Sequence, residues 1–129
     1  MPAENTRAKR VGESVRKEIA SLLTTGVKDP RAAGAVVTRV EMTGDLRSAH
    51  VHVRLLAGGD NEARRTVLVG ALRRASGLMR REIAQRLGLR HAPELRFVYD
   101  DGSDHLTDVE RLLDEIAAER GAPGNRESR

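Results

Sequence analysis

Apolar side chains recur at intervals of three or four residues between Arg7 and Thr24, and this spacing predicts an amphipathic helix. The helix is expected to end at Gly26, because glycine readily adopts the left-handed conformation that follows many helices. Residues 1–6 do not continue the pattern and are expected to form a flexible arm. The predicted apolar stripe consists of Val11, Val15, Ile19, Leu22 and Leu23.

Two β-strands are predicted next, because residues 35–43 are rich in β-forming side chains and apolar and polar residues alternate over 48–56. The short connection between them, which contains Gly44 and Asp45, predicts an antiparallel hairpin. One side of the first strand is expected to carry Val36, Thr38, Val40 and Met42. The second strand is expected to turn its apolar residues inward and to point to solvent with Ser48, His50, His52 and Arg54.

Helical periodicity returns after Asn61 and continues to Leu87, but Ala75-Ser76-Gly77 lies near its centre. We expect these small residues to break the segment into two helices that meet at a kink, since glycine has backbone conformations closed to other residues. The positions expected to face inward are Ala63, Val67, Leu68, Ala71, Leu72, Leu78, Ile83, Ala84 and Leu87.

A third strand is predicted over 94–99, with Leu95, Phe97 and Tyr99 on one face, and an acidic helix over 103–119. Three strands interspersed with helices in this order predict a single two-layer α+β domain. We expect the domain to span residues 7–118 and a disordered tail to cover 119–129.

The composition excludes several classes to which the protein could belong. The 129 residues suffice for one domain, and the lack of cysteine excludes disulfides and thiolate metal sites. No apolar run approaches the roughly 20 residues needed to span a bilayer, and the first residues lack the apolar core of a secretory signal. We therefore expect a cytoplasmic protein that does not associate with membranes.

Charge is unevenly distributed along a chain whose formal net charge is +4. Residues 73–96 hold seven Arg and two Glu, whereas residues 100–119 hold eight acidic residues and only Arg111. Such a distribution favours docking on a polyanion in one orientation. The predicted RNA-binding residues are Arg7, Lys9, Arg10, Arg16, Lys17, Arg31, Arg73, Arg74, Arg80, Arg81, Arg86 and Arg90.

Candidate catalytic chemistry is sparse. His50 and His52 lie two residues apart on one strand and could hold a metal with Glu41, although an exposed pair of this kind is more often solvated. The acidic cluster that begins at Asp100 and Asp101 could bind Mg²⁺, but it more often favours a helix N-terminus. Because nucleophile motifs and glycine-rich phosphate loops are also lacking, we expect no enzymatic activity, no cofactor and no metal.

Several short motifs occur in a characteristic order and together resemble the ribosome-binding factor A family over residues 7–117. Ala75-Ser76-Gly77 stands where an RNA-binding KH domain has a Gly-x-x-Gly loop between paired helices. The other matching segments are Arg10-Val11, Lys28-Asp29-Pro30-Arg31, Val40-Glu41-Met42, Asp45-Leu46, Arg80, Pro93-Glu94-Leu95-Arg96-Phe97 and Asp100.

The resemblance implies a KH-like domain of type II topology, αββααβ, in which an interhelical kink replaces the Gly-x-x-Gly loop. It also implies a factor that binds the free 30S small ribosomal subunit and assists late 16S rRNA maturation, including 5′-end processing, with a link to growth in the cold. We expect the protein to be a monomer. It should recognise the shape and the phosphate backbone of rRNA and read few bases. Replacing Arg80 and Arg81 with Glu should then weaken binding and spare the fold.

Other functions stay open on the sequence alone. The chain could be a KH-like RNA- or DNA-binding protein that is not dedicated to ribosome assembly. A helix-turn-helix DNA-binding protein, a metalloenzyme built on His50 and His52, and a pure protein-interaction domain are further alternatives. Within the family interpretation, Gly77 is expected to serve the geometry between two helices, so that Gly77→Val would damage the fold first.

Overall fold

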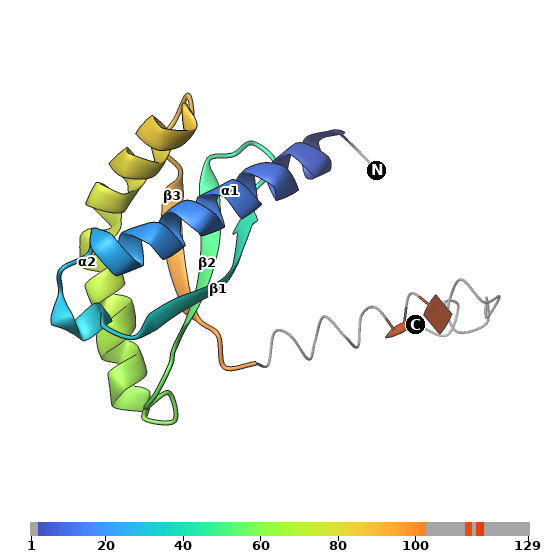
Figure 1. Cartoon of the computed structure of the whole chain (residues 1–129). Helices are drawn as coiled ribbons and strands as arrows, with labels where there is room; N and C mark the ends of the chain where they lie inside the picture. The colour runs from blue at the N-terminus through green and yellow to red at the C-terminus, as the bar shows by residue number, and fades with distance from the viewer. Residues whose placement is uncertain (1–2, 103–112, 115, 118–129) are drawn as a thin grey trace. The chain divides into compact units, whose positions relative to one another are not determined.

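The structure, a computed structural model, describes residues 3–102, 113–114 and 116–117. The chain divides into two units, Met1–Tyr99 and Asp100–Arg129, where the sequence predicted one domain to residue 118. In the first unit two long helices lie on one face of a three-stranded sheet (Figure 1). The elements are α1 (Ala3–Thr25), the 3₁₀ turn η1 (Pro30–Ala32), β1 (Ala35–Met42), β2 (Ser48–Leu55), α2 (Glu62–Leu87) and β3 (Glu94–Tyr99).

Helix α1 follows its predicted stripe, since Val15, Ile19 and Leu22 are buried. It begins at Ala3, so residues 3–6, which were expected to form a flexible arm, belong to the helix. It ends at Thr25 as predicted, with the N–H groups of Gly26 and Val27 both donating to the carbonyl of Leu22.

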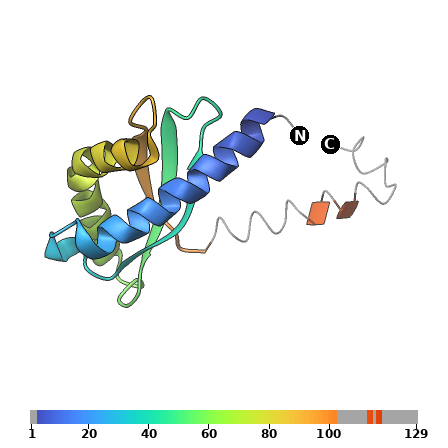
Figure 2. The same cartoon turned by 45° about the horizontal axis from the view of Figure 1, so that its top comes forward.

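The sheet has the order β1-β2-β3, with β1 antiparallel and β3 parallel to β2. A parallel pair needs a crossover connection, and α2 supplies it. The register aligns Ser48 with Glu94 at the starts of β2 and β3. The connections that precede these two strands therefore lie at the same end of the sheet, as both views show (Figure 1, Figure 2).

A β-bulge in β1 changes which side of the sheet its residues face, compared with the prediction. Val37 pairs with Val53 and Arg39 pairs with His52, so that Thr38 is the additional residue. Val37 is consequently buried before the bulge, and Val40 and Met42 pack against the core after it. The prediction that Val36 and Thr38 share a side with Val40 is wrong because strict alternation fails at the bulge.

His52 is a second correction, because its side chain was expected to face solvent and is only 4% exposed. Its Nε2 atom lies 2.9 Å from Oε1 of Glu41 on the neighbouring strand. His50 is exposed as predicted.

Helix α2 is continuous for 26 residues, so the prediction of two separate helices is wrong. Asn61 caps its start by accepting from the N–H of Arg64, and Gly88 ends it in the left-handed conformation, with φ of 62°. The helix nevertheless changes direction near its middle (Figure 1, Figure 2). The hydroxyl of Ser76 donates to the carbonyl of Arg73 at 2.8 Å, a local bond of a kind that bends helices.

The buried stripe of α2 keeps its helical spacing across Ala75-Ser76-Gly77. Leu68, Leu72, Met79 and Ile83 are fully buried at intervals that suit one helix. Leu78 was expected to face inward but is 43% exposed, because a continuous helix puts Met79 on the core side instead. Val67, also expected inward, is 46% exposed.

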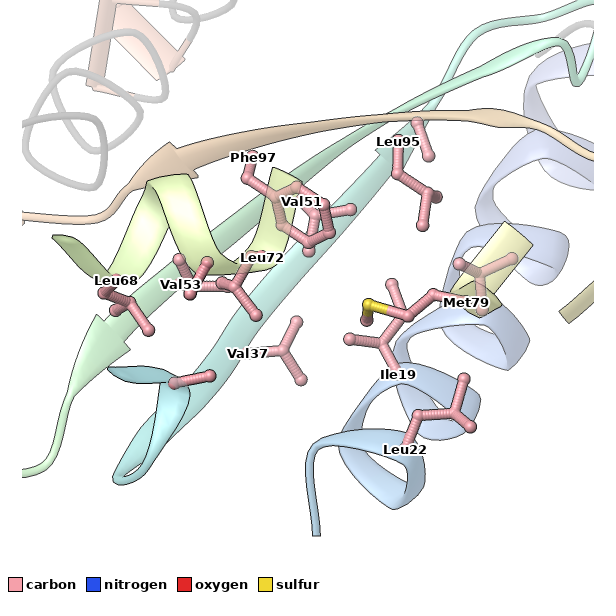
Figure 3. Close-up of a cluster of buried hydrophobic side chains, with 14 of the residues drawn as sticks. Ile19, Leu22, Val37, Val51, Val53, Leu68, Leu72, Met79, Leu95 and Phe97 are labelled. Atoms are coloured by element: carbon pink, nitrogen blue, oxygen red, sulfur yellow. The ribbon is translucent and has the colours of Figure 1, made fainter. Parts of the chain in front are cut away.

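The core forms where the stripes of α1 and α2 meet the inner face of the sheet (Figure 3). Gly12 allows α1 to approach β1 closely, since a Cβ atom at this position would lie 3.1 Å from the carbonyl oxygen of Val40. The labelled core residues in Figure 3 are Ile19, Leu22, Val37, Val51, Val53, Leu68, Leu72, Met79, Leu95 and Phe97.

Only part of the second unit is described. Asp100 accepts a hydrogen bond from the N–H of Gly102 at 3.0 Å. Residues 113–114 and 116–117 are helical, in agreement with the predicted acidic helix, whereas the remainder of that helix and the predicted tail lie outside the described residues.

Candidate nucleic-acid interface

The exposed side of α2 carries three arginines. In the described part of the chain, the guanidinium groups of Arg73, Arg74 and Arg81 make no hydrogen bond or ion pair, and all three residues are exposed. Long helical side chains lean toward the helix N-terminus. Accordingly, Nη1 of Arg74 lies 3.5 Å from where a Cβ atom of Gly70 would be, and Nη1 of Arg81 lies 3.8 Å from the corresponding position at Gly77.

Gly77 has no close packing neighbour, although the sequence predicted that it serves the geometry between two helices. It is exposed, it lies within the continuous helix, and its only neighbour within 4 Å of an added Cβ atom is the flexible end of Arg81. The fold therefore has room for a side chain here, and helix packing does not require glycine. We call Gly70, Arg73, Arg74, Gly77 and Arg81 the arginine face of α2.

Arg80, the neighbour of Arg81, has a structural role. Its Nε atom donates to the carbonyl of Pro93 at 3.0 Å, and its Nη2 atom donates to the carbonyl of Ala92 at 3.1 Å. The side chain is partly buried and ties α2 to the connection that leads into β3. It was predicted to bind RNA, but its guanidinium is engaged within the fold.

Three other predicted contacts are ion-paired on the surface. Arg86 bridges two helices, because it contacts Glu18 of α1 at 3.1 Å and Glu82 of α2 at 3.3 Å. The hydrogen bond that Arg86 donates to the carboxylate of Glu18 is the main reason that the pKa of Arg86 is raised. Arg16 and Arg31 are held in the same way, Arg16 by Glu13 at 2.6 Å and Arg31 by Asp29 at 3.0 Å.

The pKa values of Glu13 and Asp29, the partners of Arg16 and Arg31, are lowered by the same hydrogen bonds. The hydrogen bond from Arg16 lowers the pKa of Glu13, and the hydrogen bond from the side chain of Arg31 lowers that of Asp29. Arg74 adds a weaker electrostatic contribution at Asp29, which places the arginine face near η1. Exposed pairs of this kind are weak and exchange readily with other partners.

The remaining predicted cations lie on α1 and in the connection after α2. Lys9, Arg10 and Lys17 are exposed on α1, and within the described residues their side chains form no ion pair. Arg7 and Arg90 come from different parts of the chain and line one cavity.

This end cavity has a volume of about 550 Å³. The parallel pairing of β2 and β3 explains its position, because the N–H of Glu94 donates to the carbonyl of Arg47 at 2.8 Å and joins the two connections. Sequence reasoning missed Arg47 and His91, since their proximity to Arg7 and Arg90 depends on strand order. The cavity is lined by Arg7, Gly44, Asp45, Leu46, Arg47, Gly88, Leu89, Arg90 and His91.

The two aromatic residues of the chain are committed to the fold. Phe97 is buried in the core, and the hydroxyl of Tyr99 accepts a hydrogen bond from the N–H of Leu55 at 3.1 Å. Arg65 covers the ring of Tyr99 at 4.8 Å from its centroid. Neither ring is placed to stack on bases in the way that single-strand readers require.

The part of the chain that the structure describes contains no group of three His, Asp or Glu side chains placed to hold a metal ion. Neither of its long helices is apolar enough over its length to cross a membrane.

The comparisons with known proteins converge on one family. The sequence model of a family described as Ribosome-binding factor A matches residues 7–113. The chain is 47% identical to Ribosome-binding factor A of Sorangium cellulosum over 93% of its length and 94% of that protein. It is 38% identical to Ribosome-binding factor A of Desulforamulus reducens, over 91% of this chain and 95% of that protein.

Solved structures agree at the level of the fold. The crystal structure of ribosome-binding factor A from Thermus thermophilus superposes with a TM-score of 0.60 at 22% identity, covering 71% of this chain and 94% of that one. A homology model of the Thermus protein, fitted into the cryo-EM map of a 30S–RbfA complex, gives a TM-score of 0.59 at 21% identity. It covers 73% of this chain and 97% of its own.

Proposed function

Because this chain belongs to the ribosome-binding factor A family, we propose that it is a non-catalytic factor that binds the free small ribosomal subunit and assists late maturation of 16S rRNA, including 5′-end processing. The KH-like arrangement of its helices and strands is part of this proposal. The Thermus relative described as part of a 30S–RbfA complex supports the choice of the small subunit as partner.

The arginine face of α2 is the observation that carries the proposal. Three exposed guanidinium groups have no partner among the described residues, while Arg80 and Arg86 on the same helix are engaged within the fold. Guanidinium groups bind phosphates through paired, charge-assisted hydrogen bonds. At Gly70 and Gly77 the helix presents no side chain, and the guanidinium groups of Arg74 and Arg81 lie beside these positions, where rRNA phosphates can reach them.

Such a surface recognises the shape and the phosphate backbone of folded rRNA. Phosphate contacts position a protein on nucleic acid, whereas sequence is read from base edges. With Phe97 and Tyr99 held in the fold, the arginine face has few means of reading bases. The protein promotes maturation by binding one conformer of the subunit more tightly than another, which shifts the population between the two.

An alanine series tests the proposal. We expect Arg73→Ala, Arg74→Ala and Arg81→Ala each to lower the affinity for purified small subunits by about tenfold, since each removes charge-assisted hydrogen bonds to phosphate. Arg54→Ala is the matched control, because Arg54 is also exposed but lies on β2, away from α2. In cells, loss of all three arginines should leave 16S rRNA with an unprocessed 5′ end.

Two outcomes would redirect the assignment. Equal losses for the α2 variants and for Arg54→Ala would show that only the overall positive charge matters. Competition of bound protein by duplex DNA as effectively as by 16S rRNA would favour a KH-like protein with no dedicated role in ribosome assembly.

A further inference from the structure

The end cavity combines three arginines from three different elements. Arg7 comes from α1, Arg47 from the connection before β2, and Arg90 from the connection before β3. All three are exposed, and within the described residues their guanidinium groups make no hydrogen bond or ion pair. Like charges gathered in this way repel one another, so the arrangement favours an anionic ligand.

The carboxylate of Asp45, which also lines the cavity, is held by the turn to which it belongs. Its Oδ1 atom accepts from the hydroxyl of Thr43 at 2.7 Å and from the N–H of Arg47 at 3.1 Å. The Thr43 hydrogen bond is the main cause of the lowered pKa of Asp45. These bonds fix Asp45 in the turn. Its charge still attracts Arg47 electrostatically, but the guanidinium of Arg47 forms no hydrogen bond or ion pair with it and stays available to a ligand.

Leu46 occupies a conformation that its side chain disfavours. Its φ is 62°, and it is the one residue other than glycine with a positive φ in the described part of the chain. Leucine in this region carries a steric cost that glycine or asparagine largely avoids. Strain of this kind often marks a functional position, and here it accompanies an apolar side chain at the wall of a basic cavity.

The cavity has the size and chemistry of a site for one nucleotide. Its volume of about 550 Å³ lies within the range of small-ligand pockets. Guanidinium groups suit a phosphate, while Leu46 and Leu89 offer apolar surface, and His91 adds a planar ring. The carbonyl end of α2 near Gly88 and the one negative charge of Asp45 oppose an anion, but the helix effect fades within the last turn and three full positive charges outweigh both.

We propose that the end cavity binds one unpaired RNA nucleotide, with its 5′-phosphate between Arg7, Arg47 and Arg90 and its base against Leu46 and Leu89. The inference rests on the proposed function and extends it, because the arginine face recognises folded backbone whereas this cavity captures an exposed nucleotide. The protein would thereby respond to an rRNA segment that is single-stranded in one state of the subunit and paired in another.

Titration of the free protein with adenosine 5′-monophosphate, followed by the amide NMR signals of Leu46, Arg47 and Leu89, tests the site directly. Adenosine and inorganic phosphate serve as separate probes of the two halves of the ligand. We expect the nucleotide to bind more tightly than either, and Arg47→Ala to weaken it by about tenfold. Arg54→Ala should leave the affinity unchanged.

Arg47→Ala keeps the main-chain bonds of the turn, because both the N–H and the carbonyl of residue 47 remain. Leu46→Gly is the sharper variant. If glycine preserved or improved both stability and nucleotide binding, Leu46 would only shape the turn, and the proposed placement of the base against it would be overturned. If Leu46 contacts the base, glycine should preserve stability and weaken the nucleotide while leaving inorganic phosphate unaffected.

The outcomes separate the two proposals. Subunit binding without any nucleotide-dependent shift at the cavity would overturn this inference and leave the proposed function intact. If the cavity bound a nucleotide but the protein did not bind small subunits, the proposed function would be overturned and the cavity would remain a nucleotide site. Equal affinity for inorganic phosphate and for the nucleotide would also overturn the inference, since the base would then contribute nothing.

Discussion

Arg80 and Arg81 are neighbours in α2, yet the structure places them in different environments. Arg80 is partly buried and donates to the carbonyls of Ala92 and Pro93. Arg81 is exposed, lies beside Gly77, and has no partner among the described residues. Successive residues of a helix point about 100° apart, so one arginine reaches the strand connection while the next reaches solvent. What each guanidinium contacts, more than the local density of charge, decides its role.

The largest effect on stability is expected from Arg80→Ala. Removing a guanidinium that donates to two backbone carbonyls should lower the free energy of unfolding by about 2 kcal/mol, because the carbonyls of Ala92 and Pro93 lose charge-assisted bonds. Arg81→Ala should change it by less than about 0.5 kcal/mol. Urea denaturation of both variants measures the contrast, and equal losses would remove the distinction between the two arginines.

The same pair should behave in the opposite way in binding. Arg81→Ala should lower small-subunit affinity by about tenfold and reduce the salt slope of binding by a little less than one, the amount expected for one phosphate contact. Arg80→Ala, measured where it is fully folded, should leave the slope unchanged. Sedimentation with small subunits over a range of salt concentrations gives both values, and a reduced slope for Arg80→Ala would show that Arg80 also contacts rRNA.

Gly77→Ala should also change stability and subunit binding in opposite directions, with smaller effects than the arginine substitutions. Alanine favours the helix over glycine by about 1 kcal/mol, and at Gly77 its Cβ atom has room. We therefore expect a higher melting temperature together with weaker subunit binding, because the methyl group takes up space beside the guanidinium of Arg81. Gly88→Ala is the control, since its φ of 62° makes alanine destabilising there. A destabilised Gly77→Ala would restore the packing role expected from the sequence.

Lowering the pH should change the structure of the turn that holds Asp45 at the end cavity and should leave the arginine face of α2 unchanged. The pKa of Asp45 is lowered in the folded state, so its stabilising contribution is full above the ordinary value of 3.8 and is lost as the pH falls through the lower folded value. Amide NMR signals of Leu46 and Arg47 should shift in that window, and Thr43→Val should move the transition to higher pH. Signals of Arg73 and Arg81, which have no carboxylate partner among the described residues, should stay constant; a concerted shift would contradict the separation.

Much of the fold could be predicted from the sequence because local signals coincide with the tertiary structure. The stripe of α1, the two strands of the hairpin, and the stop at Gly26 follow from periodicity and glycine alone. The bulge at Thr38 could not be predicted, since one additional residue in a strand leaves no distinct pattern. The continuity of α2 could have been found, because Leu68, Leu72, Met79 and Ile83 keep one helical phase across the small residues.

The candidate site was harder to predict, since it depends on contacts between distant segments. Cation density directed attention to the region around α2, but it gave no means of telling Arg80 from Arg81. Arg47 and His91 join Arg7 and Arg90 only because β3 pairs with β2 in parallel. The burial of His52 against Glu41 is equally a property of the folded sheet.

The central claim is that the exposed arginines of α2 hold the small subunit through rRNA phosphates. The most direct test is the dependence of small-subunit affinity on salt for the wild type, for the variant with Arg73→Ala, Arg74→Ala and Arg81→Ala combined, and for Arg54→Ala. We predict a steep decrease of affinity with salt in the wild type and in Arg54→Ala, and a slope smaller by about two to three in the combined variant. An identical slope in all three proteins would contradict the account.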